Sequence, residues 1–141
     1  DVDIVVCPIV REHDGLAMSS RNAYLDQNER KAATILYKTL TQAAEMITRG
    51  DSSSEMIEQC MHEMLAQEPL VTQVQYAGVY DADTLEKTSS FSKRTLIAVA
   101  VLLGKTRLID NMVLELPMNV KGKSGGQERH DMGGISGKNP A

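Results

Sequence analysis

A short polar loop near the start of the chain carries the residues best suited to chemistry. Ser19 and Ser20 offer hydroxyl and backbone N–H donors, and Arg21 adds a guanidinium directly after them. The planar fork of a guanidinium binds a phosphate through two parallel hydrogen bonds. Gly15 lets the loop pivot, so that these donors can close after a ligand has entered. This spacing favours a loop that closes over the phosphates of a bound nucleotide.

The same loop has a second interpretation, which spacing alone leaves open. It could be a polar linker before a helix, with Arg21 in a surface ion pair of little energetic value. Within the loop, His13 and Asp14 could act as an acid–base pair. No nucleophile stands in a recognisable relation to them, however, and the following Gly15 favours a polar turn.

Two further stretches have the ending of a phosphate-binding P-loop. They are Gly104-Lys105-Thr106 and Gly122-Lys123-Ser124. A P-loop needs a glycine five residues earlier, where this chain has Val99 and Pro117, so the backbone cannot wrap a phosphate. We expect a hairpin turn at the first stretch and tail sequence at the second.

Composition and charge exclude several classes of protein. The chain has 141 residues, enough for one domain with a modest core. No apolar run approaches the roughly 18 residues that span a bilayer, and no secretory leader is expected. The formal net charge of −4 argues against nucleic acid as a partner. We therefore expect a cytoplasmic protein without a membrane or nucleic-acid partner.

The cysteines and the remaining histidines give no sign of a metal site. Cys7 and Cys60 are far apart and lack metal-ligand spacing, so we expect both to be buried apolar residues in a reducing compartment. His62 and His130 have no metal-binding partner in the sequence, and we expect both to be solvated. No metal ligand and no catalytic residue is predicted.

Two helices are predicted after the loop. Asp26 and Glu29 have capping-box spacing at the start of the first helix, and Gly50 ends it. The apolar face of this helix follows i, i+3, i+4 spacing: Ala33, Leu36, Tyr37, Leu40, Ala43, Ala44 and Ile47. Ser52 and Glu55 repeat the capping spacing before a second helix, which the next proline stops. Its apolar stripe is Ile57, Cys60, Met61, Met64 and Leu65.

Strands are predicted on both sides of these helices. Before the loop, the apolar run at residues 4–10 predicts a buried strand. After the helices, alternation over residues 71–80 predicts a half-buried strand, and the β-branched run at 95–103 predicts a central one. A turn at 104–107 leads to a third strand at 108–116. These elements predict an α+β fold, a small antiparallel three-stranded sheet with two main helices packed on one face.

The composition changes at Pro117. The segment from 117 to 141 holds more than half of the chain's ten glycines and few apolar side chains. Such a segment cannot bury enough surface to offset the entropy of ordering it. We predict one domain over residues 1–116 and a flexible, disordered tail over 117–141.

The loop also resembles a known family signature. Residues 14–25 read Asp-Gly-Leu-Ala-Met-Ser-Ser-Arg-Asn-Ala-Tyr-Leu. They are similar to the signature loop of pantothenate synthetases (pantoate–β-alanine ligases), which corresponds to the KMSKS-type loop of class I aminoacyl-tRNA synthetase-like nucleotidyltransferases. The resemblance continues through residues 81–85, 92–94 and 103–111. It covers residues 1–116, and the tail has no counterpart.

The resemblance implies an ATP-dependent ligase. In this family ATP and Mg²⁺ convert the pantoate carboxylate to an acyl-adenylate with release of pyrophosphate, and the β-alanine amine then attacks with release of AMP. The chemistry depends on positioning and charge stabilisation. By match to the family, Ser19, Ser20 and Arg21 would contact the triphosphate, and Met18 would lie against the adenosine. Val10 would line the nucleotide site.

The resemblance further implies that this chain is one part of an enzyme. The family's N-terminal Rossmann-like domain, with its HxGH motif and pantoate pocket, has no counterpart here, and the chain opens at Asp1 without an initiating Met. Residues 1–116 would be the C-terminal nucleotide lid of a homodimeric enzyme, inactive alone. Pantoate and β-alanine would bind through the missing domain. Arg107 and Asp110 match family positions, and we expect structural roles for them, as in a strand-end ion pair.

An alternative function belongs to a different class. The domain could be a detached or fused binding module that keeps the fold without catalysis. In that case its helical face or basic tail would dock a partner.

Overall fold

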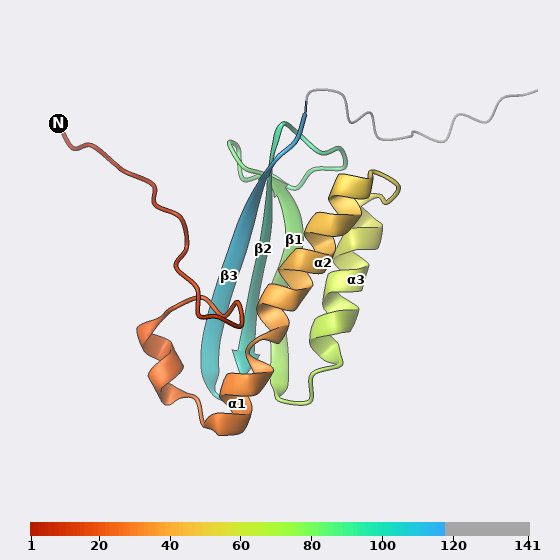
Figure 1. Ribbon diagram of the computed structural model, residues 1–141. Coiled ribbons are helices and arrows are strands. Elements are labelled where there is room, and N and C mark those ends of the chain that lie inside the picture. Colours follow the sequence, from red (N-terminus) through yellow and green to blue (C-terminus); the bar gives the residue numbers. More distant parts are fainter. Residues whose placement is uncertain (118–141) are drawn as a thin grey trace, which may run out of the picture.

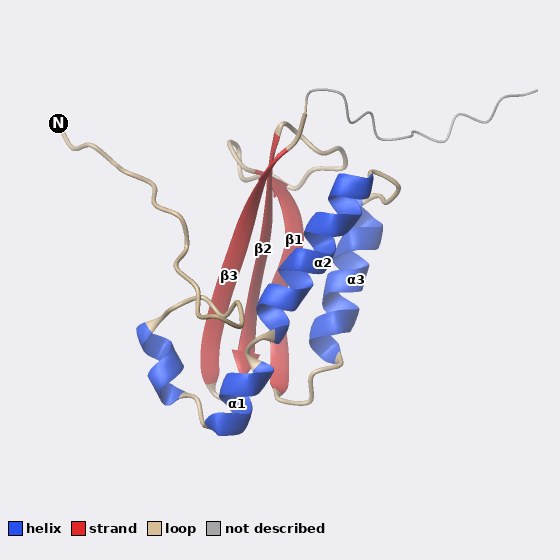
Figure 2. Cartoon of the chain, viewed as in Figure 1, coloured by secondary structure: helices blue, strands red, loops and turns tan. Residues whose placement is uncertain are grey.

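The described part of the chain forms two layers, a sheet and a pair of helices (Figure 1, Figure 2). The computed structural model describes residues 1–117. Its strands form one antiparallel sheet in the order β1-β2-β3. The elements are η1 (Ser20–Tyr24), α1 (Gln27–Ala32), α2 (Ile35–Arg49), α3 (Ser54–Ala66), β1 (Val71–Asp81), β2 (Arg94–Leu103) and β3 (Thr106–Glu115). Because α2 and α3 cover one face of the sheet, the predicted α+β fold is confirmed.

The first predicted helix is divided into α1 and α2. The predicted capping box opens α1: Asp26 Oδ1 accepts from the backbone N–H of Glu29 at 2.8 Å, and Glu29 Oε2 accepts from that of Asp26 at 3.0 Å. The break falls at Thr34, whose hydroxyl donates to the carbonyl of Lys31 at 2.8 Å. This side-chain bond competes with the regular backbone ladder. Gly50 ends α2 as predicted.

The second predicted helix, α3, begins one residue later than the capping spacing indicates. Ser53, not Ser52, is its N-cap, and the Ser53 hydroxyl accepts from the backbone N–H of Met56 at 3.3 Å. The Ser52 hydroxyl donates to Asp51 instead. Either serine satisfies the spacing rule to within one residue, so only the folded backbone selects between them.

Two bulges in β1 change which of its side chains face the helices. The pairing of β1 with β2 shifts between Val71 and Gln73 and again between Val74 and Tyr76. Each extra residue reverses the side-chain alternation. As a result Val74 packs against the same core as Ala77 and Val79. In a strand without bulges, it would lie on the same face as Tyr76 and Tyr80 instead.

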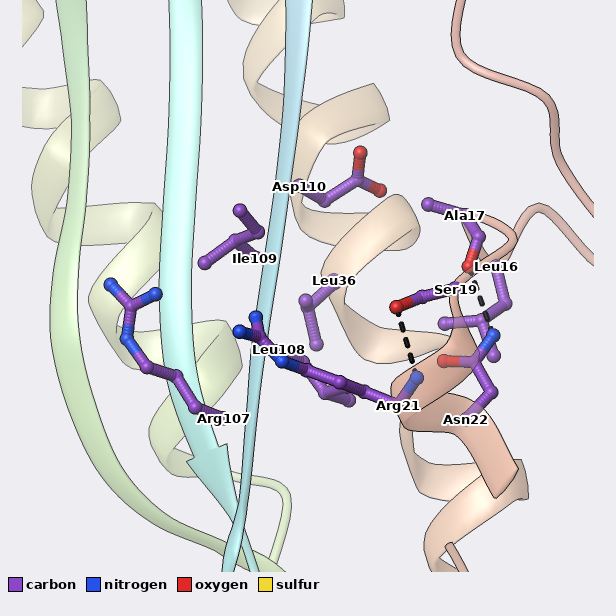
Figure 3. Close-up of a pocket in the computed structure, with 10 residues that line it drawn as sticks. All are labelled: Leu16, Ala17, Ser19, Arg21, Asn22, Leu36, Arg107, Leu108, Ile109 and Asp110. Atoms are coloured by element: carbon purple, nitrogen blue, oxygen red, sulfur yellow. Dashed lines mark hydrogen bonds between the residues drawn. The ribbon is translucent and has the colours of Figure 1, made fainter. Parts of the chain in front are cut away.

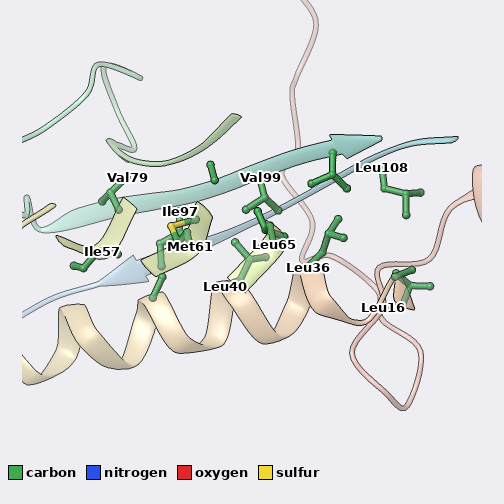
Figure 4. Packing of buried hydrophobic residues seen from close by; sticks show 14 of the residues in the cluster. Leu16, Leu36, Leu40, Ile57, Met61, Leu65, Val79, Ile97, Val99 and Leu108 are labelled. Carbon is green, nitrogen blue, oxygen red and sulfur yellow. The ribbon is translucent and has the colours of Figure 1, made fainter. Parts of the chain in front are cut away.

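The core lies between the sheet and the two long helices (Figure 4). Its largest side chains come from α2, α3 and the central strand, and all are fully buried: Leu36, Leu40, Ile47, Ile57, Met61, Leu65, Ile97, Val99 and Leu103. The apolar stripes predicted for both helices therefore face the sheet. Leu16 extends this core from the polar loop, which ties the loop to the helical layer.

Residues 4–10, predicted as a buried strand, are an exposed extended segment. They lead away from the two layers (Figure 1), and no strand pairs with them within residues 1–117. Apolar side chains at the start of the chain are 81–90% exposed: Val2, Ile4, Val5 and Val6. Cys7 is exposed and Cys60 half-buried, so the expectation of two buried cysteines is wrong. A strand needs a neighbour for its backbone hydrogen bonds, and the described residues provide none.

The remaining predictions concern the tail, the histidines and membrane-spanning segments. The tail predicted over 117–141 lies outside the described residues from position 118 onward, together with Gly122-Lys123-Ser124 and His130. His62 is exposed, as expected. Within residues 1–117, no helix has the length and apolarity needed to cross a bilayer.

Candidate functional site

The loop predicted to bind phosphate begins with a tight turn. The backbone N–H of Met18 donates to the carbonyl of Val10 at 2.9 Å, and that of Glu12 donates to Leu16 at 2.8 Å. The Asp14 carboxylate accepts from the backbone N–H of Leu16 at 3.3 Å, which is the geometry of an Asx turn. The polar turn predicted around His13 and Asp14 is therefore confirmed.

Gly15 packs this turn against α2. Its φ is +91°, and a Cβ atom placed on it would lie 2.0 Å from Cδ1 of Tyr37. Any larger residue would clash with the ring and would be strained in the left-handed region. In this structure the glycine serves close packing. The pivoting motion inferred from the sequence remains a prediction.

Arg30 forms an ion pair with Asp14 in this turn. Its guanidinium donates to both oxygens of Asp14, at 2.8 and 3.1 Å. This hydrogen bond holds the pKa of Asp14 below its ordinary value, with a smaller contribution from the Leu16 N–H, against the opposing effect of partial burial. Arg30 therefore stabilises the charged form of the carboxylate that accepts from the backbone of the turn.

Arg11 connects the loop to β3. Its Nη1 donates to Asp110 Oδ2 at 2.6 Å and to the carbonyl of Gly15 at 3.0 Å. Its Nη2 donates to Asp110 Oδ1 at 3.1 Å and to the carbonyl of Asn111 at 3.2 Å. The guanidinium also stacks 4.6 Å from the centre of the Tyr37 ring. One side chain thus joins the loop, α2 and β3.

These contacts test the structural roles expected for Arg107 and Asp110. Asp110 does form an ion pair, so the expectation is confirmed for that residue, but its partner is Arg11. Arg107 forms no ion pair within residues 1–117, and its Nε donates to the side-chain oxygen of Gln75 at 2.6 Å. The ion-pair expectation is therefore wrong for Arg107. Sequence reasoning missed Arg11, because no local pattern links residues 99 positions apart.

The hydroxyls and Arg21 follow this anchored turn. Ser19 caps η1, and its Oγ accepts from the backbone N–H of Arg21 at 3.2 Å, which leaves its own hydroxyl proton free for another acceptor (Figure 3). Asn22 steadies the bend by donating to the carbonyl of Ala17 at 3.0 Å. Ser19, Ser20 and Arg21 are all exposed, so their donors are accessible to a ligand.

Ser19 and Arg21 line a small cleft between the loop and β3 (Figure 3). Its volume is about 30 Å³, above the roughly 10–15 Å³ that a cavity needs to hold one water molecule. The lining residues are Leu16, Ala17, Ser19, Arg21, Asn22, Leu36, Arg107, Leu108, Ile109 and Asp110. Pockets for drug-sized ligands occupy roughly 300–1,000 Å³. The cleft therefore offers a small recess for a polar group, and a nucleotide would need a second wall.

The other predicted ligand residues, Val10, Met18 and Ser20, do not line this cleft. Val10 and Met18 are joined by a backbone hydrogen bond, and their side chains are 65% and 53% exposed. Ser20 lies between two cleft residues but does not line the cleft. The structure thus brings Val10 next to Met18, and Ser19 next to Arg21. Within residues 1–117, no group of three or more His, Cys, Asp or Glu could hold a metal ion.

Comparison with known proteins shows the family to which this chain belongs. A family model described as Pantoate-beta-alanine ligase matches residues 1–113. This chain belongs to the pantoate-beta-alanine ligase family. The resemblance carried by the loop is therefore confirmed, and the match runs from the exposed N-terminal segment to within β3.

Individual members of the pantoate-beta-alanine ligase family support the assignment. The pantothenate synthetase of Thermodesulfovibrio yellowstonii is 49% identical over 115 residues, which are 82% of this chain and 41% of that protein. The pantothenate synthetase of Caldicellulosiruptor bescii is 51% identical, over 82% of this chain and 40% of that protein. The crystal structure of the Thermus thermophilus pantothenate synthetase superposes with a TM-score of 0.72 at 35% identity, covering 77% of this chain and 38% of that one. The chain spans about two fifths of the length of these relatives.

Proposed function

We propose that this chain binds the triphosphate of ATP as the C-terminal nucleotide lid of a pantoate–β-alanine ligase. The observation that carries the proposal is the pairing of Ser19 with Arg21 at one cleft, within the signature loop of the family. The cleft is too small for a whole nucleotide, so it suits one phosphate group at the edge of a larger site. ATP, pantoate and β-alanine would be the substrates.

The loop would act on the first of two steps. When the pantoate carboxylate attacks the α-phosphorus, negative charge builds up on the departing pyrophosphate. The guanidinium of Arg21 and the hydroxyls of Ser19 and Ser20 would stabilise that charge, and they would do so more strongly in the transition state than in the ground state. Mg²⁺ would arrive with ATP as part of the substrate, held by the phosphates. The amine of β-alanine would then displace AMP from the acyl carbon.

The adenosine would lie on the neighbouring apolar surface. Val10 and Met18 are joined by a backbone hydrogen bond and are more than half exposed, so both are accessible to a ligand. A purine ring is flat and apolar on both faces, and a thioether packs well against such a ring. The base would then lie beside Met18, and the phosphates would lie at Ser19 and Arg21.

The rest of the active site would come from a preceding domain. Residues 1–116 would form the lid, while pantoate and β-alanine would be bound mainly by that other domain, in a homodimeric cytoplasmic enzyme. The length of the relatives supports this division, because this chain aligns with only 41% of the Thermodesulfovibrio protein. Alone, the chain would bind phosphate without making pantothenate.

A chimera tests the proposal. Residues 1–116 of this chain replace the matching part of the Thermodesulfovibrio yellowstonii pantothenate synthetase, and pantothenate, AMP and pyrophosphate are measured. We expect product, and a loss of about 1.5–3 kcal/mol of transition-state stabilisation in Arg21→Gln for each charged hydrogen bond removed. Lys31→Gln, on the exposed side of α1, is the matched control. A folded chimera without pantoyl-adenylate would instead favour the binding-module alternative.

A further inference from the structure

Arg107 and Arg21 reach the same cleft from different elements. Arg107 is the second residue of β3, and Arg21 extends from η1 across β3 toward it (Figure 3). The described hydrogen-bond partner of the Arg107 side chain is the neutral amide oxygen of Gln75, 2.6 Å from Nε. Within residues 1–117, neither guanidinium lies in ion-pair contact with a carboxylate.

The carboxylate that also lines this cleft does not balance these charges. Asp110 Oδ2 accepts from Arg11 at 2.6 Å. Its Oδ1 accepts from Arg11 at 3.1 Å and from the backbone N–H of Asn111 at 2.8 Å. Its side chain is only 2% exposed. Because Arg11 already neutralises Asp110, the cleft keeps a surplus of two positive charges.

This excess of positive charge favours the binding of an anion in the cleft. Two like charges at one recess raise the energy of the empty site, and a bound anion removes that cost. A guanidinium fork matches the geometry of a phosphate group, whereas the cleft itself admits only a small group. Two forks on separate elements therefore fit a chain of linked phosphates better than a single phosphate.

We propose that Arg107 is a second phosphate-binding residue, which together with Arg21 binds a linear polyphosphate. The inference rests on the proposed function, in which Arg21 contacts the triphosphate of ATP. The anion would bridge η1 and β3, so that Arg21 and Arg107 would bind the departing pyrophosphate from two sides. Gln75, on β1, accepts from Arg107 Nε, so the two terminal nitrogens of the guanidinium would serve the anion.

Calorimetric titration of the 141-residue chain with inorganic tripolyphosphate tests this inference. Arg107→Gln should weaken tripolyphosphate binding about tenfold or more, since each lost bond to a charged group is worth at least one decade in affinity. Arg107→Lys keeps the charge without the fork and should weaken binding by a smaller factor. Orthophosphate should bind more weakly than tripolyphosphate to the unaltered chain.

Two control variants separate a phosphate contact from other effects. Lys105→Gln removes an exposed cation of the same hairpin that does not line the cleft. It should change the affinity by less than about twofold, because water and dissolved salt screen an exposed charge. Gln75→Ala removes the hydrogen-bond partner of Arg107 and should preserve most of the affinity. If Gln75→Ala weakens binding as much as Arg107→Gln, the role of Arg107 is structural. If Lys105→Gln does so, the effect is general electrostatics.

The remaining outcomes distinguish this inference from the proposed function. If Arg21→Gln abolishes tripolyphosphate binding while Arg107→Gln leaves it intact, Arg107 is not a phosphate ligand and the proposed function stands. Absence of saturable binding by the unaltered chain at millimolar tripolyphosphate would overturn this inference, together with the expectation that the chain alone binds phosphate. The ligase function itself is tested separately, by product formation in the chimera. Thermal unfolding of each variant confirms that it is folded.

Discussion

The guanidinium of Arg11 and the carboxylate of Asp110 meet at 2.6 Å, although 99 residues separate them in the chain. The pair joins the first turn of the phosphate loop to the edge strand β3. It lies mostly out of solvent, with 19% of the Arg11 side chain and 2% of the Asp110 side chain exposed. This contact therefore fixes the loop over the cleft, together with the burial of Leu16 and the close packing of Gly15 against Tyr37.

Removing one member of this pair should destabilise the chain strongly. Asp110→Ala leaves Arg11 without its counter-ion, and we expect a loss of about 3 kcal/mol in the free energy of unfolding, as for other buried pairs that lose one partner. The double variant Arg11→Met, Asp110→Leu should recover most of that loss, since apolar replacement of both members is nearly neutral. Urea unfolding measures both. A double variant as unstable as Asp110→Ala would contradict the ion-pair explanation.

The Asp14–Arg30 pair should make the loop sensitive to acid. The pKa of Asp14 is lowered in the folded chain by the Arg30 hydrogen bond, so the pair stabilises the fold above the unfolded pKa of about 4. This contribution is lost as the pH falls through the lowered folded value. Unfolding curves recorded between neutral pH and pH about 3 should show it.

Arg30→Gln is the variant that isolates this effect. It should flatten the acid-side loss of stability, because the Asp14 pKa then returns toward its ordinary value. Lys31→Gln, one residue along α1 and exposed, should leave the acid-side slope unchanged. Equal slopes for the unaltered chain and Arg30→Gln would show that Asp14 does not carry the pH dependence.

Gly15 should be intolerant of a methyl group. At φ +91°, Gly15→Ala would be strained, and its Cβ would stand 2.0 Å from the Tyr37 ring, so we expect a cost above about 2 kcal/mol. Gly50→Ala, at φ +72°, carries the backbone cost alone and should lose about 1 kcal/mol. In a Tyr37→Ala background the additional cost of Gly15→Ala should fall. An unchanged additional cost would mean that the ring contact is unimportant.

Thr39 offers a way to stabilise the fold. It is fully buried in α2, and its hydroxyl has no hydrogen-bond partner within the described residues. Thr39→Val replaces that hydroxyl with a methyl group of similar size, so we expect a gain of about 1 kcal/mol in the free energy of unfolding. Thr48→Val is the matched control, because the exposed Thr48 donates to the carbonyl of Ala44 at 2.8 Å. A destabilised Thr39→Val variant would imply an unseen partner for the hydroxyl.

Local features of the fold could be predicted because their causes lie within a few residues. The capping box at Asp26 and Glu29 and the turn at Gly104 are confirmed where the sequence places them. The same applies to the order of two helices followed by strands. The register of β1 could not be predicted, because its two bulges depend on pairing with a strand that comes later in the chain.

The segment at residues 4–10 illustrates the limit of local prediction. Its apolar run indicates a strand, but backbone hydrogen bonds from a neighbour decide whether a strand forms, and the described residues provide no such neighbour. The same limit applies to the candidate functional site. The donors of the loop, Ser19, Ser20 and Arg21, could be identified before folding was considered, because they are contiguous. Folding was needed to bring Arg11 to Asp110 and Arg107 to the cleft of Arg21, because the packing of α2 against the sheet is what carries the loop to β3.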